Sequence, residues 1–341
     1  MKRLLAMVTA ALLLCVGTTR AGPFEDGTAA YERGNYATAV KLFRALAAQG
    51  DAKAQSELGY MYAKGHGVAQ NHAVALKWYR LAAAKGAASA QYRLGAAYYL
   101  GLGIARDYVE AVKWYRLAAA QGDAQAQYHL GVMYYLGQGV AQDYVEAVRL
   151  YRQAAAQGDA TAQFILGAMY AEGERVGQDH VEAVKWYRLA AAQGYAAAQY
   201  HLGESYLKGQ GVTLDYAEAI TWYRLAAMQR NAGAQYNLGV MYAKGEGVAQ
   251  DYVAAVTWYR LAATQGDAEA QYNLGVMYAK GEGVTQDYVR AHMWLNLGAV
   301  AGDAEAIKNR DIVAKLMTPS QIAEAQKMTR NCQARKFKGC D

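Results

Sequence analysis

The sequence predicts an all-α fold, an α/α superhelical solenoid of helix-turn-helix repeats. Three observations predict it: a dipeptide at a fixed period, apolar residues at helical spacing inside each period, and paired glycines that interrupt them. A fixed period of this size marks a repeat array, in which neighbouring units stack because no unit buries its apolar face alone. The dipeptide is Leu-Gly, it recurs every 36 residues, and its leucines are Leu58, Leu94, Leu130, Leu166, Leu202, Leu238 and Leu274.

Residues 123–158 illustrate the first helix of a unit. Asp123 is suited to cap a helix N-terminus, because its carboxylate accepts hydrogen bonds from the unpaired N–H groups of the first turn. Gly137 and Gly139 end the helix, since glycine tolerates the positive φ of a C-terminal turn. Between Asp123 and Gly137, apolar residues follow at helical spacing: Ala126, Leu130 and Met133.

A second helix follows the glycine loop. Asp143 with Glu146 three residues later resembles a capping box, and Gly158 ends the helix. We expect Gly131 and Ala147 to face each other, because a larger side chain would push the two helices apart. Trp and Tyr recur in this helix at helical spacing, which favours packing between repeats over a cofactor site. The Trp positions are Trp78, Trp114, Trp186, Trp222, Trp258 and Trp294, with Leu150 in the third unit.

Residues 1–21 are predicted to be a signal peptide. Lys2 and Arg3 precede the apolar run Leu4–Val16, and small residues then offer a cleavage site before Gly22. The run is short for a membrane span, so no transmembrane segment is expected. Cys15 raises the alternative of a lipoprotein, which Leu14 before it disfavours.

The net charge of +6 comes mainly from the two ends of the chain. The leader holds three basic residues and no acidic one, and Lys308–Asp341 hold eight Lys or Arg and three Asp or Glu. The repeats are left close to neutral, so they offer no cationic stripe for nucleic acid. Cys332 and Cys340 remain once the leader is removed, and an even pair in an exported chain predicts a disulfide; the alternative is two free or metal-binding thiols.

The unit Ala234–Ala263, which reads AQYNLGVMYAKGEGVAQDYVAAVTWYRLAA, resembles a Sel1-like repeat, a relative of the tetratricopeptide repeat with a longer glycine-containing loop. Seven units cover residues 51–302. Residues 22–50 have a shorter loop and resemble a tetratricopeptide hairpin that caps the N-terminus, and residues 303–341 are expected to form C-terminal capping helices and a basic tail. The resemblance implies an exported bacterial scaffold or adaptor that binds proteins.

Some units depart from the pattern. Arg175 replaces the second loop glycine of the fourth unit and Arg230 the closing glycine of the fifth, so we expect both turns to change shape, because a positive φ is costly for Arg. His72 and His180 replace a tyrosine after the loop. Some exported relatives have a disulfide in every repeat and weak β-lactam hydrolysis ascribed to them; the units here contain no Cys, so that activity is not carried over.

In arrays of this kind the first helices line the concave side. The residue two places before each Leu forms an aromatic column, interpreted either as a binding strip or as packing between first helices: Tyr92, Tyr128, Phe164, Tyr200, Tyr236 and Tyr272. The next column holds Arg93, His129 and His201, and then Asn237 and Asn273. With Lys244 and Lys280, these two amides are predicted to hold an acidic peptide or a chain terminus.

No catalytic, cofactor or metal site is predicted. The six His fall in repeat columns, and no phosphate-binding loop is present. We expect a periplasmic or secreted, non-enzymatic scaffold that binds a protein or peptide. The alternative is a glycan- or peptidoglycan-associated envelope protein, with weak hydrolysis by residues from several repeats. The tail Gln333–Lys338 is interpreted as a solvated segment or as a weak contact for anionic envelope components.

Overall fold

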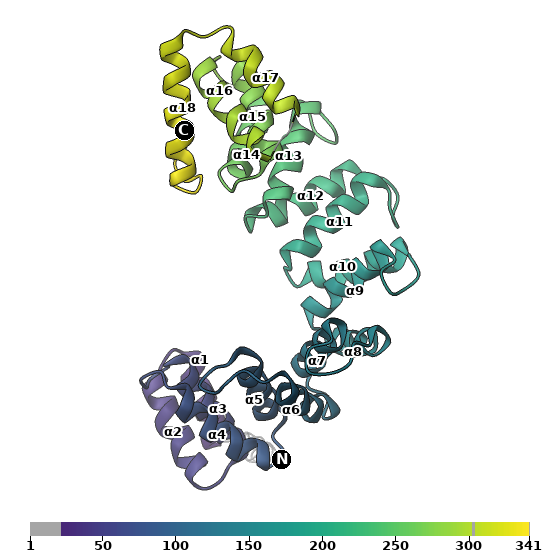
Figure 1. The fold of residues 1–341 in the computed structure, drawn as a ribbon. Helices are drawn as coiled ribbons and strands as arrows, with labels where there is room; N and C mark the ends of the chain where they lie inside the picture. The colour runs from purple at the N-terminus through teal and green to yellow at the C-terminus, as the bar shows by residue number, and fades with distance from the viewer. Residues whose placement is uncertain (1–21, 302–303, 341) are drawn as a thin grey trace, which may run out of the picture. The chain divides into compact units, whose positions relative to one another are not determined.

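The computed structural model describes residues 22–301 and 304–340, and the regular elements in them are all helices (Figure 1). The predicted signal peptide, with Cys15, lies outside the described residues. The chain divides into two compact units, one up to Leu150 and one from Tyr151 onward, which we call unit 1 and unit 2. The all-α prediction is confirmed.

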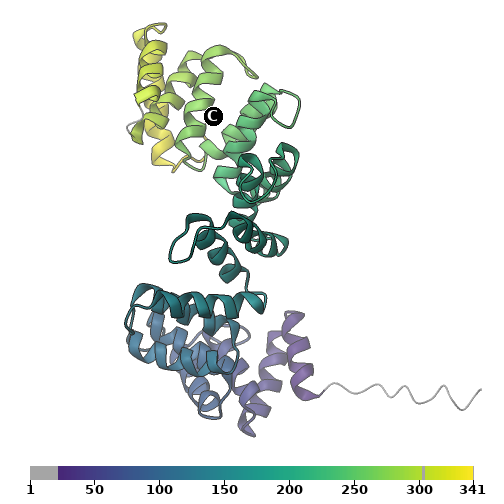
Figure 2. The same ribbon diagram turned by 90° about the vertical axis from the view of Figure 1, so that its right-hand side faces the viewer.

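Unit 1 is a succession of helix hairpins. In each hairpin the two helices pack side by side, as α1 and α2 do in Figure 2 (purple), and the second helix packs on the first helix of the next hairpin. Helix α8 (Tyr144–Ala156) crosses the boundary between the units. The helices of unit 1 are α1 (Pro23–Glu32), α2 (Tyr36–Ala48), α3 (Ala52–Lys64), α4 (His72–Ala84), α5 (Ala88–Leu100), α6 (Tyr108–Ala120) and α7 (Ala124–Leu136).

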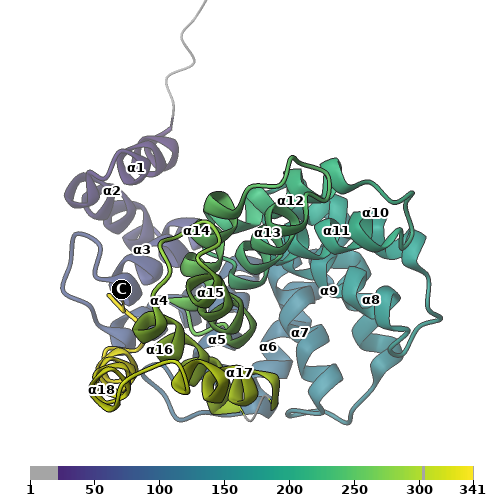
Figure 3. The ribbon, with the colours of Figure 1, turned by 90° about the horizontal axis from the view of Figure 1, so that it is seen from above.

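Unit 2 continues the pattern through the hairpins α9–α10, α11–α12, α13–α14 and α15–α16. Two further helices, α17 and α18, pack on α16, and Figure 3 shows α18 beside it. The helices are α9 (Ala160–Glu172), α10 (His180–Ala192), α11 (Ala196–Lys208), α12 (Tyr216–Met228), α13 (Ala232–Lys244), α14 (Tyr252–Ala263), α15 (Ala268–Lys280), α16 (Tyr288–Gly298), the 3₁₀ turn η1 (Ala299–Ala301), α17 (Ala304–Ala314) and α18 (Pro319–Ala334).

The predicted helix ends are confirmed with one change. The Asp123 carboxylate accepts from the Ala126 N–H at 2.8 Å, and the C-cap of α7 is a glycine in the left-handed region. Asp143 likewise caps α8, accepting from the Glu146 N–H at 3.0 Å. The second half of the expected capping box is wrong, because the Glu146 carboxylate accepts from the Arg149 guanidinium, at 2.7 Å from Nε, instead of reaching back to the cap.

The expectation that the turns at Arg175 and Arg230 change shape is also wrong. Both residues keep the positive φ of the glycines they replace, 64° and 66°. The Arg230 N–H donates to the Ala227 carbonyl at 2.9 Å, and Gly194 makes the equivalent bond to Ala191 at the same distance. The backbone hydrogen bonds of the turn therefore outweigh the steric cost of an L-residue there, about 1–2 kcal/mol.

The glycine of each Leu-Gly pair packs against a ring of the second helix. A Cβ on Gly203 would lie 2.7 Å from a ring carbon of Tyr223, and one on Gly59 the same distance from Tyr79. The next nearest atom to this Cβ position on Gly59 is the Ala75 carbonyl oxygen, at 3.2 Å. The prediction that this glycine sets the helix separation is sound at these positions, but the group that it accommodates is the tyrosine ring more than the facing alanine.

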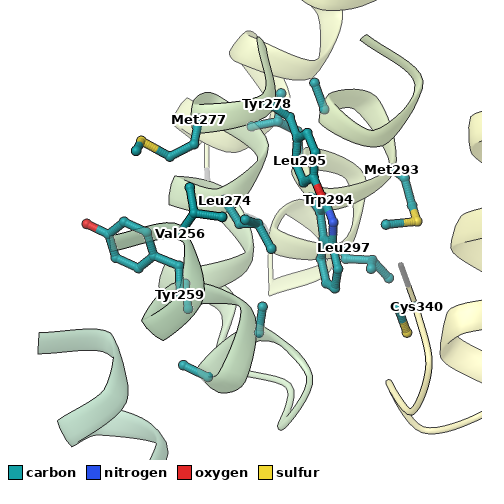
Figure 4. Close-up of a cluster of buried hydrophobic side chains, with 14 of the residues drawn as sticks. Val256, Tyr259, Leu274, Met277, Tyr278, Met293, Trp294, Leu295, Leu297 and Cys340 are labelled. Atoms are coloured by element: carbon teal, nitrogen blue, oxygen red, sulfur yellow. The ribbon is translucent and has the colours of Figure 1, made fainter. Parts of the chain in front are cut away.

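The tryptophan column lies between repeats, as predicted. Trp78 of α4 packs against the core formed by α1, α2 and α3, and Trp114 of α6 packs against the core of α4 and α5. Leu150 is buried in its place in α8. At the other end Trp294 is fully buried within the last core, where Figure 4 shows it among Met293, Leu295 and Leu297.

The C-terminal segment closes the last core. Thr318 and Gln321 form the predicted capping box of α18, with Pro319 at its first position. Cys332 and Cys340 are joined by a disulfide of 2.00 Å, and both are buried. Between them Phe337 packs on the same core, with its ring 3.1 Å from where a Cβ of Gly266 would lie. The tail is thus anchored by an aromatic side chain that the sequence analysis did not single out.

Candidate binding face

One face of the first helices carries the predicted binding column. We call it the first-helix face and define it in α5 by Tyr92, Arg93 and Ala96, with the equivalent residues of the other first helices at the 36-residue period. These three residues line a common cavity in unit 1, and Tyr272 and Val276, in the columns of Tyr92 and Ala96, line another in unit 2. Aromatic and polar residues therefore share this face in both units.

In unit 1 the aromatic column packs on its own hairpin and on the next. The Tyr92 ring lies 5.9 Å from Tyr115 of α6 and 5.6 Å from His129 of α7, between ring centroids. His129 stacks on Tyr115 at 5.6 Å with 12° between the planes, and its neighbour Tyr128 lies edge-on to it. Tyr92 is half-buried, so it packs and still presents one side on the face.

Arg93 makes a polar version of the same contact. Its guanidinium donates to the Ser56 carbonyl at 2.9 Å and pairs with Glu57 at 3.1 Å, both in the preceding first helix. It also lies over the Tyr60 ring, 4.4 Å from the centroid, as a cation–π contact. Arg93 therefore joins two repeats by charge where His129 joins two by stacking.

In unit 2 the aromatic column again packs on its own hairpin and on a histidine of the next. Phe164 lies 6.0 Å from Tyr187 and 5.7 Å from His201, which stacks on Tyr187 at 5.5 Å. The His201 Nδ1 lies 3.3 Å from Glu204, and Lys208 pairs with the same carboxylate at 2.9 Å. The His201 imidazole and the Lys208 ammonium hold the pKa of Glu204 below its ordinary value, although burial opposes them.

The tyrosines at the C-terminal side meet the asparagine column. The hydroxyl of Tyr200 interacts with Asn237, and that of Tyr236 with Asn273, each in the next repeat. Burial, with the nearby carboxylates of Glu204 and Glu269, raises the pKa of each tyrosine to about 12. The contact recurs once more beyond the recognised repeats, where Asn309 Nδ2 of α17 donates to the Tyr272 hydroxyl at 2.9 Å. Helix α17 therefore keeps the register of a first helix.

The members of the predicted amide-and-ammonium pairs each contact a neighbour within the protein. Asn273 Nδ2 donates to the Glu269 carbonyl of its own helix at 3.1 Å. Lys244 and Lys280 are exposed at the ends of α13 and α15, where they lie 3.7 Å from Glu246 and 3.8 Å from Glu282. The two columns are seven residues apart, about 10 Å along a helix.

Each unit has a cavity on this face. The one in unit 1 has a volume of about 220 Å³ and is lined by Tyr60, Lys64, Tyr92 and Arg93 together with apolar residues. The one in unit 2 has a volume of about 380 Å³ and lies between α15, α16 and α17, with Lys280 among its lining residues. A groove for a partner side chain is therefore present in each unit.

Two ladders of side-chain contacts were missed by the sequence analysis. A glutamine in each first helix from α3 to α15 is buried and donates to an alanine carbonyl eight residues earlier, as Gln163 does to Ala155 at 3.0 Å. An arginine of a second helix donates to a tyrosine hydroxyl of the next first helix, as Arg188 does to Tyr206 at 2.8 Å. The signal was present in the sequence, because each arginine precedes its tyrosine by 18 residues. The arginine–tyrosine pairs are Arg44–Tyr62, Arg116–Tyr134, Arg152–Tyr170, Arg188–Tyr206, Arg224–Tyr242 and Arg260–Tyr278.

Within residues 22–301 and 304–340, no three His, Cys, Asp or Glu side chains come together as a metal site. In the same part of the chain, no helix is long and apolar enough to cross a bilayer.

Comparison with known proteins identifies the repeat. The family model described as Sel1 repeat matches residues 20–51, 52–86, 88–123, 124–159, 160–195, 196–231, 232–267 and 268–303. It thus includes the first hairpin, for which the sequence analysis expected a tetratricopeptide hairpin. The structure of a Sel1 repeat protein from Oxalobacter formigenes is 37% identical, with a TM-score of 0.65, covering 70% of this chain and 98% of that one.

A second solved structure is a protective antigen of uropathogenic Escherichia coli strains that displays an SLR fold. It is 31% identical, with a TM-score of 0.46, and the match covers 93% of this chain and 85% of that one. A search of the curated proteins found no match.

Proposed function

The chain belongs to the Sel1 repeat family, and from this premise we propose that it is an exported, non-enzymatic scaffold that binds a protein or peptide on the first-helix face. Solenoids of this family typically serve as scaffolds for protein interactions. The proposal adds to that general role a surface, a class of partner and a compartment.

The observation that carries the proposal is the composition of the first-helix face. Half-buried rings such as Tyr92, Tyr200 and Tyr236 are held by the hairpin behind them and expose the remaining side. Rigid aromatic side chains give a large contact area at a low cost in conformational entropy, which is why they dominate binding hot spots. Tyr92 and Tyr272 of the same column each line a cavity, one in each unit, and these cavities provide depth for partner side chains.

Export is supported by the chain's two ends. The leader has a basic start and an apolar run, and the buried Cys332–Cys340 disulfide suits an oxidising compartment. Intact mass spectrometry of protein secreted from its host, without reductant, should show a chain that begins at Gly22 and is two hydrogens lighter than the dithiol. A full-length chain or free thiols would contradict export.

Partner binding is tested by affinity capture from the native envelope with a charge placed on the face. Val240 of α13 occupies the position that Tyr60 and Val276 hold in the two cavity linings, so Val240→Glu puts a carboxylate on the face. Val253→Glu is the control off this face, because Val253 is 63% exposed at the start of the second helix α14, whereas Val240 is half-buried against the last core. We expect Val240→Glu to lose the captured partner and Val253→Glu to keep it, with both variants equally helical by circular dichroism.

Replacing the rings themselves is a poorer test, because Tyr200 and Tyr236 also pack on Tyr223 and Tyr259. Capture that survives Val240→Glu, or that is lost equally in the control, would contradict binding on this face.

A further inference from the structure

The two cavities occupy the same place in the repeat, six repeats apart. In both, the wall is formed by a first helix, the second helix of the same hairpin and the next first helix. Corresponding residues are Tyr60 and Val276, Lys64 and Lys280, Arg93 and Asn309, and Ala96 and Ile312. We call these two cavities the unit 1 wedge and the unit 2 wedge. Since α17 keeps the register of a first helix, the unit 2 wedge is the last such cavity of the array.

The chemistry of the two wedges differs. In unit 1 the Arg93 guanidinium lies over Tyr60 and pairs with Glu57, so this cation is already used inside the protein. In unit 2 the equivalent positions are apolar or neutral, and the Tyr272 hydroxyl is satisfied by Asn309. The unit 2 wedge has the larger volume, and most of its lining residues are aliphatic. These are Val276, Ala279, Leu295, Ile312, Val313 and Leu316.

One charged residue, Lys280, is among the residues that line this wedge. The Lys280 side chain is 59% exposed, and its ammonium lies 3.8 Å from the Glu282 carboxylate, a long and solvent-exposed ion pair. Lys315 is exposed beside Leu316, while the carboxylate of Asp311 accepts from Arg310 at 2.8 Å. Ile312 and Leu316, which line the wedge, remain 47% and 60% exposed.

We propose that this wedge binds the C-terminal residue of a partner polypeptide, with an apolar side chain in the cavity and its α-carboxylate on Lys280. A C-terminal residue carries both groups on one Cα, which matches a cavity whose aliphatic wall and cation line one hollow of about 380 Å³, within the usual range for ligand sites. The proposal rests on the proposed function, because it names the ligand chemistry for one part of the first-helix face.

The test uses the full chain with ¹³C-labelled isoleucine δ1-methyl groups. The probe is the peptide Gly-Ser-Gly-Ser-Gly-Leu with a free C-terminus, and its C-terminal amide is the second arm. The sequence contains six isoleucines, so the spectrum is simple; Ile312 reports on the wedge, and Ile220, 3% exposed in the core of α11–α13, is the internal reference. We expect saturable shifts at Ile312 with the free peptide, no shift at Ile220, and weaker binding of the amide.

Matched substitutions in equivalent positions locate the site. Ala279→Trp fills the unit 2 wedge and should abolish the Ile312 shifts, whereas Ala63→Trp at the equivalent place in unit 1 should not. Lys280→Gln should weaken binding roughly two- to fivefold, the range for one exposed charge pair, and Lys244→Gln, one repeat earlier, should leave it unchanged.

Unshifted Ile312, equal binding of acid and amide, or shifts that persist in Ala279→Trp would overturn this inference. The proposed function would survive that outcome if envelope capture still depended on Val240. If the peptide failed to bind as expected and envelope capture also did not depend on Val240, both this inference and the proposed function would be rejected.

Discussion

The interior of a hairpin and the first-helix face beside it share one 36-residue period in unit 2, but they differ in what the period repeats. In the interior the residues themselves recur: Gly203 lies on Tyr223, and Gly239 lies on Tyr259, so that a Cβ on each glycine would lie 2.7 and 2.5 Å from the ring. On the face only the contact recurs, because His201 stacks on a ring of the preceding repeat while Asn237 meets a hydroxyl there.

The difference shows that packing constrains the identity of the interior residues more strongly than that of the residues on the face. An interior ring has one shape of space to fill, so a changed residue leaves a void or a clash. A position on the face needs only some contact with the repeat before it, and stacking, hydrogen bonding and charge all meet that need. The variable residues of the face are therefore the ones that can distinguish partners at little cost to the fold.

The largest expected effect is the loss of an interior ring. Tyr223→Ala removes a fully buried side chain and should destabilise the protein by about 3–5 kcal/mol, the range for large core truncations. Tyr200→Ala, one helix away on the face, removes a half-buried ring and should cost about 1–2 kcal/mol. Urea unfolding followed by circular dichroism measures both. Equal losses would remove the distinction between interior and face.

A smaller effect is expected from one added methyl group in the interior. Gly203→Ala would place a Cβ 2.7 Å from the Tyr223 ring, so the helices must separate, at a cost of about 1–3 kcal/mol. Gly177→Ala is the control, since no atom lies within 4 Å of its Cβ position and its φ is not positive. Thermal unfolding should show a lowered midpoint for the first variant alone; a fall for both would implicate loss of glycine itself.

These two contrasts also explain how much the sequence could predict. Caps such as Asp123 and Thr318 are local, because donor and acceptor lie three residues apart, and their prediction holds. The stacking of His201 on Tyr187 and the Arg188–Tyr206 bond join different repeats, so they depend on how neighbours are registered. The turns at Arg175 and Arg230 were misjudged from residue preference alone, since both residues keep the positive φ of the glycines they replace.

The ionisation of a tyrosine on the face provides a third contrast. Burial and the Glu204 carboxylate raise the pKa of Tyr200 from 10.0 to about 12, so above pH 10 the unfolded chain loses this proton first. The contribution of the protonated Tyr200 to the free energy of unfolding is complete below pH 10 and is lost as the pH rises towards 12. Tyr200→Phe should remove about 1 kcal/mol of the destabilisation at pH 11. Urea midpoints at pH 8 and pH 11 measure it, and parallel losses in both proteins would refute it.

The smallest effect is expected where a non-glycine residue closes the turn between two repeats. Arg230 has a φ of 66° at the position where Gly194 and Gly266 close the neighbouring turns. Arg230→Gly relieves the left-handed strain but adds freedom to the unfolded chain, so we expect a net gain of about 0.5–1 kcal/mol. Arg230→Lys should change nothing, because it retains both the Cβ and the charge. The variants are compared by thermal unfolding. A gain in stability for Arg230→Lys as well would assign the effect to the guanidinium. A loss of stability for Arg230→Gly would mean that the Arg230 side chain itself stabilises the turn. This position would then belong with the variable residues of the face and not with the interior.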